Sequence, residues 1–137
     1  MDTSVKTKIL LVDDEADILF VLEQGLIDFG YHVRVANSVD EALTVLSSWE
    51  PDFIVSDYSM PEKTGLDLLE RVQLTLPNFI REGRFAILTG NVSFVEHHSH
   101  ALEIPVLEKP VSFERLVTLF SSQSNPWKST TSVQAQK

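Results

Sequence analysis

The chain has 137 residues, of which 43% are hydrophobic and 23% charged, and this predicts one soluble globular domain with a real core. It contains no cysteine, which excludes disulfides and thiolate metal sites and gives no sign of secretion. The net charge of −9 and the scattered basic residues argue against direct nucleic-acid binding, because phosphate binding needs a basic patch. The start of the chain lacks a signal-peptide core, and no apolar run approaches the roughly 20 residues that span a bilayer. We therefore expect a cytoplasmic protein without membrane insertion.

Strand and helix patterns alternate along the sequence. Gly30 is expected to end the first helix, and Ser38 to cap the second, with Glu41 completing a capping box. The connection over 77–84 is longer than a tight loop requires. The predicted elements, in chain order, are strand 8–12, helix 15–29, strand 31–36, helix 38–48, strand 53–56, helix 65–76, strand 85–88, helix 92–101, strand 104–107 and helix 112–121.

These alternating units predict an α/β fold. The strands are nearly continuous apolar runs, which is typical of a parallel sheet covered on both faces. We expect a flavodoxin-like, doubly wound, five-stranded parallel sheet with five helices in three α/β/α layers. Residues 1–7 are expected to form an N-terminal arm, residues 8–121 the domain, and residues 122–137 a polar, disordered tail.

Polar residues follow four of the predicted strands at the point where each strand ends. They are Asp13, Asp14, Asp57, Thr89 and Lys109. The carboxyl ends of parallel strands form the ligand crevice of such sheets, so we expect these side chains to lie together. Each residue alone has an ordinary explanation as a helix cap or a turn former. Their joint position at different strand ends favours a common site.

The set of groups suits phosphoryl chemistry. A carboxylate such as Asp57 can attack phosphorus and form an acyl phosphate. Asp13 and Asp14 provide the oxygen ligands that Mg²⁺ prefers. Lys109 offers a positive charge to a phosphoryl oxygen, and Thr89 offers a hydroxyl donor.

The chain resembles the receiver domain of two-component response regulators, and chemotaxis regulators in particular. The matching motifs are Leu-Val-Asp-Asp-Glu at 11–15, Asp-Tyr-Ser-Met-Pro at 57–61 with Gly65, Leu-Thr-Gly at 88–90 and Glu-Lys-Pro at 108–110. The resemblance covers residues 8 to about 121. We attribute Gly65 to a backbone conformation or close approach that other residues do not allow.

The resemblance implies roles for the phosphoacceptor and for the residues that would bind Mg²⁺. Asp57 would be the phosphoacceptor, taking its phosphoryl group from a sensor histidine kinase or a histidine phosphotransfer protein. Asp14 would bind Mg²⁺ directly, Asp13 mainly through water, and the backbone carbonyl of Ser59 would complete the protein ligands. The protein would be a signalling domain that catalyses at most its own phosphorylation and slow dephosphorylation.

The resemblance also implies a switch. Thr89 and Lys109 would contact the phosphoryl group and draw their loops inward, remodelling a face that binds an unknown downstream protein. Family members often carry Tyr or Phe where this chain has Val106, and valine excludes a ring-rotation switch there. We expect dimerisation to be weak, or dependent on phosphorylation.

Several alternatives stay open. No output domain is expected after about residue 121, so the chain is either a stand-alone regulator or a receiver cut from a hybrid histidine kinase or multidomain regulator. A receiver-like scaffold would act without phosphorylation. A hydrolase of the haloacid dehalogenase type is disfavoured because Ser59 stands where that family needs a second Asp. His97, His98 and His100 are read as a solvated helix face, with metal binding or pH sensitivity as alternatives.

Overall fold

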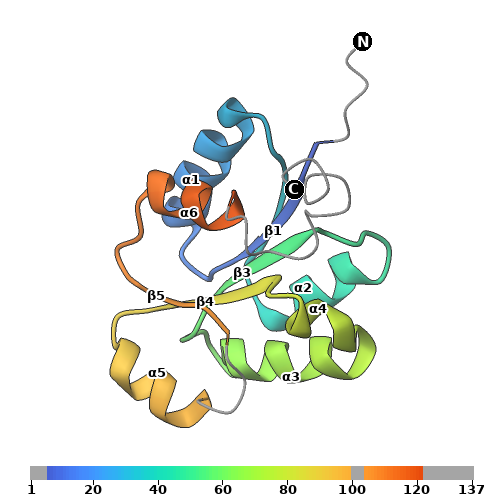
Figure 1. Ribbon diagram of the computed structural model, residues 1–137, viewed down its shortest axis with the longest axis vertical. Coiled ribbons are helices and arrows are strands. Elements are labelled where there is room, and N and C mark those ends of the chain that lie inside the picture. The colour runs from blue at the N-terminus through green and yellow to red at the C-terminus, as the bar shows by residue number, and fades with distance from the viewer. Residues whose placement is uncertain (1–5, 100–103, 122–137) are drawn as a thin grey trace, which may run out of the picture.

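Five parallel strands form a central sheet in the computed structural model, which describes residues 6–99 and 104–121. Their order across the sheet is β2-β1-β3-β4-β5 (Figure 1). The predicted flavodoxin-like, doubly wound fold is confirmed. The strands are β1 (Lys8–Val12), β2 (His32–Ala36), β3 (Phe53–Asp57), β4 (Phe85–Thr89) and β5 (Val106–Glu108).

Helices cover both faces of the sheet (Figure 1). One face carries α1 (Ala16–Phe29) and α6 (Phe113–Phe120), and the other carries the remaining helices. Those are α2 (Val39–Leu46), α3 (Gly65–Thr75), α4 (Pro77–Arg81) and α5 (Val92–Ser99). No helix in the described part of the chain is both long and apolar enough to cross a membrane.

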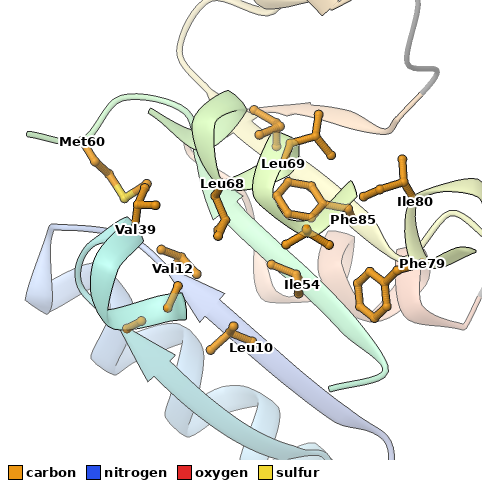
Figure 2. Close-up of a cluster of buried hydrophobic side chains, with 14 of the residues drawn as sticks. Leu10, Val12, Val39, Ile54, Met60, Leu68, Leu69, Phe79, Ile80 and Phe85 are labelled. Atoms are coloured by element: carbon orange, nitrogen blue, oxygen red, sulfur yellow. The ribbon is translucent and has the colours of Figure 1, made fainter. Parts of the chain in front are cut away.

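Two apolar layers hold the helices to the sheet. Because side chains alternate along a strand, Leu10 and Val12 enter the layer under α2 and α3, whereas Ile9 and Leu11 enter the layer under α1 and α6. Figure 2 shows Leu68 of α3 packed over Ile54 in the first of these layers. Every residue of β3 and β4 is buried, as expected for central strands covered on both sides.

The helix boundaries follow from local chemistry. Gly30 ends α1 in the left-handed conformation, with φ of 114°, as the sequence predicts. The Ser38 hydroxyl accepts the Glu41 N–H at 3.0 Å, but the Glu41 carboxylate accepts the N–H of Asn37, one residue before the cap. The predicted capping box is therefore wrong in its second half.

A complete capping box opens α3 instead. The Thr64 hydroxyl accepts the N–H of Asp67 at 3.3 Å, and the Asp67 carboxylate accepts the N–H of Thr64 at 2.7 Å. This box was not predicted, although the Thr-x-x-Asp spacing in the sequence is typical of one.

The prediction of five helices is wrong by one short helix. Residues 77–81 form α4, which Pro77 begins at a position where its missing N–H costs nothing. Phe79 and Ile80 are buried under the sheet, and this burial stabilises a helix too short to form alone.

The last strand also differs from its predicted bounds, and the end of the helix before it is not described. The pairing of Thr89 with Glu108 extends β5 to residue 108, and no strand is observed at 104–105. Helix α5 is described to Ser99, so the rest of the predicted helix lies outside the described residues, as do most of the N-terminal arm and the tail at 122–137.

Candidate functional site

The register of the sheet brings the predicted site residues together. Val12 is level with Ser56, Asp57 with Leu88, and Thr89 with Glu108. Each strand therefore ends within one residue of its neighbour. Asp13, Asp57, Thr89 and Lys109 consequently lie along the carboxyl edge of four adjacent strands.

A direct contact joins Lys109 to Asp57. The Lys109 ammonium donates to Asp57 Oδ1 at 3.1 Å, and it lies 3.9 Å from Asp13 Oδ2 and 3.8 Å from Glu15 Oε1. The backbone N–H of Lys109 donates to the Thr89 carbonyl at 2.8 Å, which fixes the base of the lysine against β4. The Lys109–Pro110 peptide bond is cis. Glu15 was not predicted as a site residue, although it is the last residue of the motif at 11–15.

Three carboxylates face one another beside this lysine. Oxygens of Asp13, Asp14 and Asp57 all lie within 4.8 Å of one another, and we call these three residues the acidic edge. Asp13 and Asp57 are buried, whereas Asp14 is exposed. Asp13 Oδ1 accepts the N–H of Glu15 at 2.9 Å, but its Oδ2 is buried without a hydrogen-bond partner among the described residues.

This oxygen donor set fits a small divalent cation. Carboxylate oxygens at such spacing repel one another, and a cation between them offsets this repulsion. Asp13 Oδ2, which accepts no hydrogen bond from the described residues, could then coordinate the cation. Hard ions such as Mg²⁺ and Ca²⁺ prefer oxygen ligands over nitrogen or sulfur ligands.

The pKa values of Asp13, Asp57 and Lys109 are all raised at the acidic edge. Burial raises the pKa of Asp13 to about 6; the Asp57 charge adds to the rise, and the Glu15 N–H and Lys109 oppose it. Burial also raises the pKa of Asp57, against the hydrogen bond and charge of Lys109. Burial lowers the pKa of Lys109, but its bond to Asp57 and the surrounding carboxylates outweigh this, so the pKa lies above its ordinary value.

The loop after β3 is held by backbone contacts. The N–H of Tyr58 donates to the Leu88 carbonyl at 2.8 Å, and the N–H of Gly65 donates to the Tyr58 carbonyl at 2.8 Å. A Cβ at Gly65 would lie 2.5 Å from the carbonyl oxygen of Asp57 and 2.9 Å from Ile87. Close approach, one of the two predicted explanations, therefore accounts for this glycine.

The structure also describes Thr89, Ser59 and Val106 among the remaining residues singled out from the sequence. Thr89 is buried, and its hydroxyl accepts the N–H of Asn91 at 3.0 Å. Ser59 is exposed, and its backbone opposes the rise in the pKa of Asp57. Val106 is half-buried in the layer under α3. The side chains of His97 and His98, and all of His100, lie outside the described residues.

A mostly apolar hollow adjoins the edge on the α1 side. It has a volume of about 310 Å³ and lies between α1 and the segment after β5, with Val21, Val111 and Lys109 among its lining residues. Val21 is 67% exposed and the neighbouring Phe20 is 62% exposed. The first half of α1 therefore presents apolar surface at a hollow that Lys109 also lines.

The sequence of this chain matches the response regulator receiver domain family over residues 9–121. It is 27% identical over 119 residues to a probable chemotaxis protein CheY of Rhizobium etli, an alignment that covers 85% of this chain and 91% of that protein. Three other curated relatives, from Rhodospirillum rubrum, Guillardia theta and Arabidopsis thaliana, are matched over only 18–29% of their own length.

Solved structures agree with this assignment. The chemotaxis response regulator CheY4 of Vibrio cholerae superposes with a TM-score of 0.74 at 27% identity, covering 85% of this chain and 97% of that one. A response regulator protein from Burkholderia pseudomallei, solved with a phosphorylated aspartic acid, a calcium ion and citrate, has a TM-score of 0.74 at 25% identity, covering 96% of this chain and 72% of that one. The chain belongs to the receiver domain family of two-component response regulators.

Proposed function

We propose that Asp57 accepts a phosphoryl group from a phosphohistidine on a sensor kinase or a histidine phosphotransfer protein. The observation that carries this proposal is the position of the Asp57 carboxylate, which is buried, lies 3.1 Å from the Lys109 ammonium and shares the acidic edge with Asp13 and Asp14. The phosphorylated aspartic acid and calcium ion in the Burkholderia pseudomallei protein support the same chemistry.

The proposed step is a displacement at phosphorus. An Asp57 carboxylate oxygen attacks the phosphorus atom, a P–O bond forms, and the P–N bond to the donor imidazole breaks. The electron pair of that bond returns to the imidazole nitrogen, which carries a proton from solvent when it leaves. Lys109 offsets negative charge on the phosphoryl oxygens, and the Thr89 hydroxyl donates to one of them.

A divalent cation, for which we propose Mg²⁺, would be held by Asp13, Asp14, Asp57 and the backbone carbonyl of Ser59. When bound, it supplies the positive charge that lets a carboxylate approach a phosphoryl group. The buried Oδ2 of Asp13, which has no hydrogen-bond partner among the described residues, supports this assignment.

The apolar hollow supports a proposal for the surface that binds the phosphoryl donor. The apolar hollow beside Lys109, with exposed Phe20 and Val21 on α1, would receive the helix that carries the donor histidine. We further propose that phosphorylation changes the face that binds a downstream protein, with weak or phosphorylation-dependent dimerisation.

The intact mass of the protein after incubation with a small acyl-phosphate donor tests the proposal. We expect one added phosphoryl group that requires Mg²⁺ and is absent from Asp57→Asn. Asp28→Asn, which changes an exposed carboxylate on α1, is the matched control and should be modified like the wild type. Donor consumption, followed in parallel, detects an adduct that hydrolyses too fast to accumulate. Absence of both adduct and Mg²⁺-dependent donor consumption would favour a scaffold that works without phosphorylation.

A further inference from the structure

Two aromatic rings join the loop after β3 to helix α5. Tyr58 directly follows Asp57, and its ring meets the ring of Phe94 in α5 edge to face, with centroids 5.9 Å apart and an interplanar angle of 79°. Tyr58 is half-buried, while Phe94 is 42% exposed although it takes part in this contact. The loop after β3 and the first turn of α5 therefore touch through this pair.

A second connection joins the same helix turn to Thr89. The N–H of Phe94 donates to the side-chain oxygen of Asn91 at 3.0 Å, and the N–H of Asn91 donates to the Thr89 hydroxyl oxygen at 3.0 Å. Since a hydroxyl oxygen that accepts one bond keeps its own proton, Thr89 remains able to donate to a group on Asp57. These two bonds link Thr89 to Phe94 through Asn91.

We propose that Tyr58 and Phe94 are positioning residues that couple phosphorylation of Asp57 to the position of α5; this inference rests on the proposed function. When the Thr89 hydroxyl turns toward a phosphoryl group, the β4–α5 loop follows it toward Asp57. Phe94 then moves onto the Tyr58 ring, loses its exposed surface and fixes the first turn of α5. The ring pair holds that arrangement, because edge-to-face contacts depend strongly on geometry.

Position 106 carries no aromatic ring in this protein. Val106 is half-buried in the layer under α2 and α3, and branching at Cβ restricts its χ1, so it offers no ring to rotate. Tyr58 and Phe94 place aromatic surface on the other side of Thr89, next to the helix that has to respond. Phosphorylation would thus act on α5 through the contact between the Tyr58 and Phe94 rings.

Hydrogen exchange of the Phe94 and Val95 amides, measured on the full chain with and without the acyl-phosphate donor and Mg²⁺, tests this coupling. Intact mass in each sample gives the phosphorylated fraction, to which exchange is normalised. We expect phosphorylation to slow exchange in the wild type roughly twofold to tenfold, the range expected for one aromatic pair. Phe94→Leu and Tyr58→Leu should each remove this slowing, and the double variant should lose no more than either single variant.

Two further variants guard against trivial explanations. Phe94→Tyr keeps a ring and should retain the slowing, whereas Phe29→Leu removes an exposed ring of α1, on the opposite face of the sheet, and should leave it unchanged. Phosphorylated leucine variants that show the same slowing as the wild type would overturn the inference. A wild type that takes up no phosphoryl group would overturn the proposed function, and the inference with it, and the mass spectrum distinguishes these two outcomes.

Discussion

The same central strands form the apolar layers and the acidic edge, yet burial acts in opposite directions in the two regions. Burial of side chains stabilises the fold in the layers and destabilises it at the edge. In the layers, burial of Phe53 and its edge-to-face contact with Phe120 at 5.0 Å stabilise the fold. At the edge, burial of Asp13 and Asp57 opposes their charge and raises both pKa values. The strands therefore hold a destabilising cluster in place with the stability that their apolar residues provide.

The largest expected effect lies in the layers. Phe53→Ala should lower the free energy of unfolding by about 3–5 kcal/mol, because it leaves a cavity between β3 and α6. Phe20→Ala, at a side chain that is 62% exposed, should change it by less than about 0.5 kcal/mol. Urea unfolding of both variants measures the contrast, and equal losses would show that the described packing is wrong.

Gly65 lies against both the backbone of Asp57 at the acidic edge and Ile87 in an apolar layer. Gly65→Ala should cost about 1–3 kcal/mol and impair phosphoryl acceptance, because the new Cβ would lie 2.5 Å from the backbone carbonyl of Asp57. Gly90→Ala is the matched control, since a Cβ there meets nothing within 4 Å. Thermal unfolding and the intact-mass assay check both variants, and the prediction fails if the two alanines behave alike.

The acidic edge makes stability depend on pH. Asp13 has a folded pKa of about 6, above its ordinary value, so between roughly pH 4 and 6 the folded state binds more protons than the unfolded state. Its contribution to stability therefore falls as pH rises through this window, by about 1–3 kcal/mol. Asp13→Asn keeps the oxygen that accepts the Glu15 N–H and removes the titration.

The wild type, compared with Asp13→Asn in metal-free buffer, should thus lose relative stability from pH 4 to pH 7. Denaturant unfolding at several pH values measures the difference. A stability difference between the two proteins that stays constant with pH would show that Asp13 is not perturbed by burial.

The smallest expected effect concerns the loop after β3. Glu62 adopts a φ of 69°, in the left-handed region where asparagine is favoured over other side chains. Glu62→Asn should therefore raise the free energy of unfolding by about 0.5–1 kcal/mol, and urea unfolding measures the gain. A loss of stability would mean that the Glu62 side chain makes a contact that matters more than its backbone conformation.

The sequence predicts much of the fold because most of its signals are local. Gly30, the Ser38 cap and the apolar runs each act through neighbouring residues, and the polar strand ends come together once the sheet is parallel. Helix α4 was missed because five residues carry too little periodicity, and burial of Phe79 and Ile80 decides its conformation.

Parts of the site depend on tertiary structure that no local pattern encodes. The contact of Tyr58 with Phe94 joins a residue of the loop after β3 to a residue of α5, and the lack of a hydrogen bond at Asp13 Oδ2 depends on how the strands pack. The sequence indicates which groups meet at the edge, whereas their burial and their perturbed pKa values require the structure.

The most direct test of this account is a Mg²⁺ titration of the unfolding free energy of the wild type and of Asp13→Asn at pH 7.5. Without Mg²⁺ we expect the variant to be more stable, because it lacks one buried charge. Added Mg²⁺ should stabilise the wild type, which keeps all three carboxylates, and should stabilise the variant much less, so that the difference shrinks or reverses. A wild type that is already the more stable protein without Mg²⁺, or that gains nothing from Mg²⁺, would contradict the account.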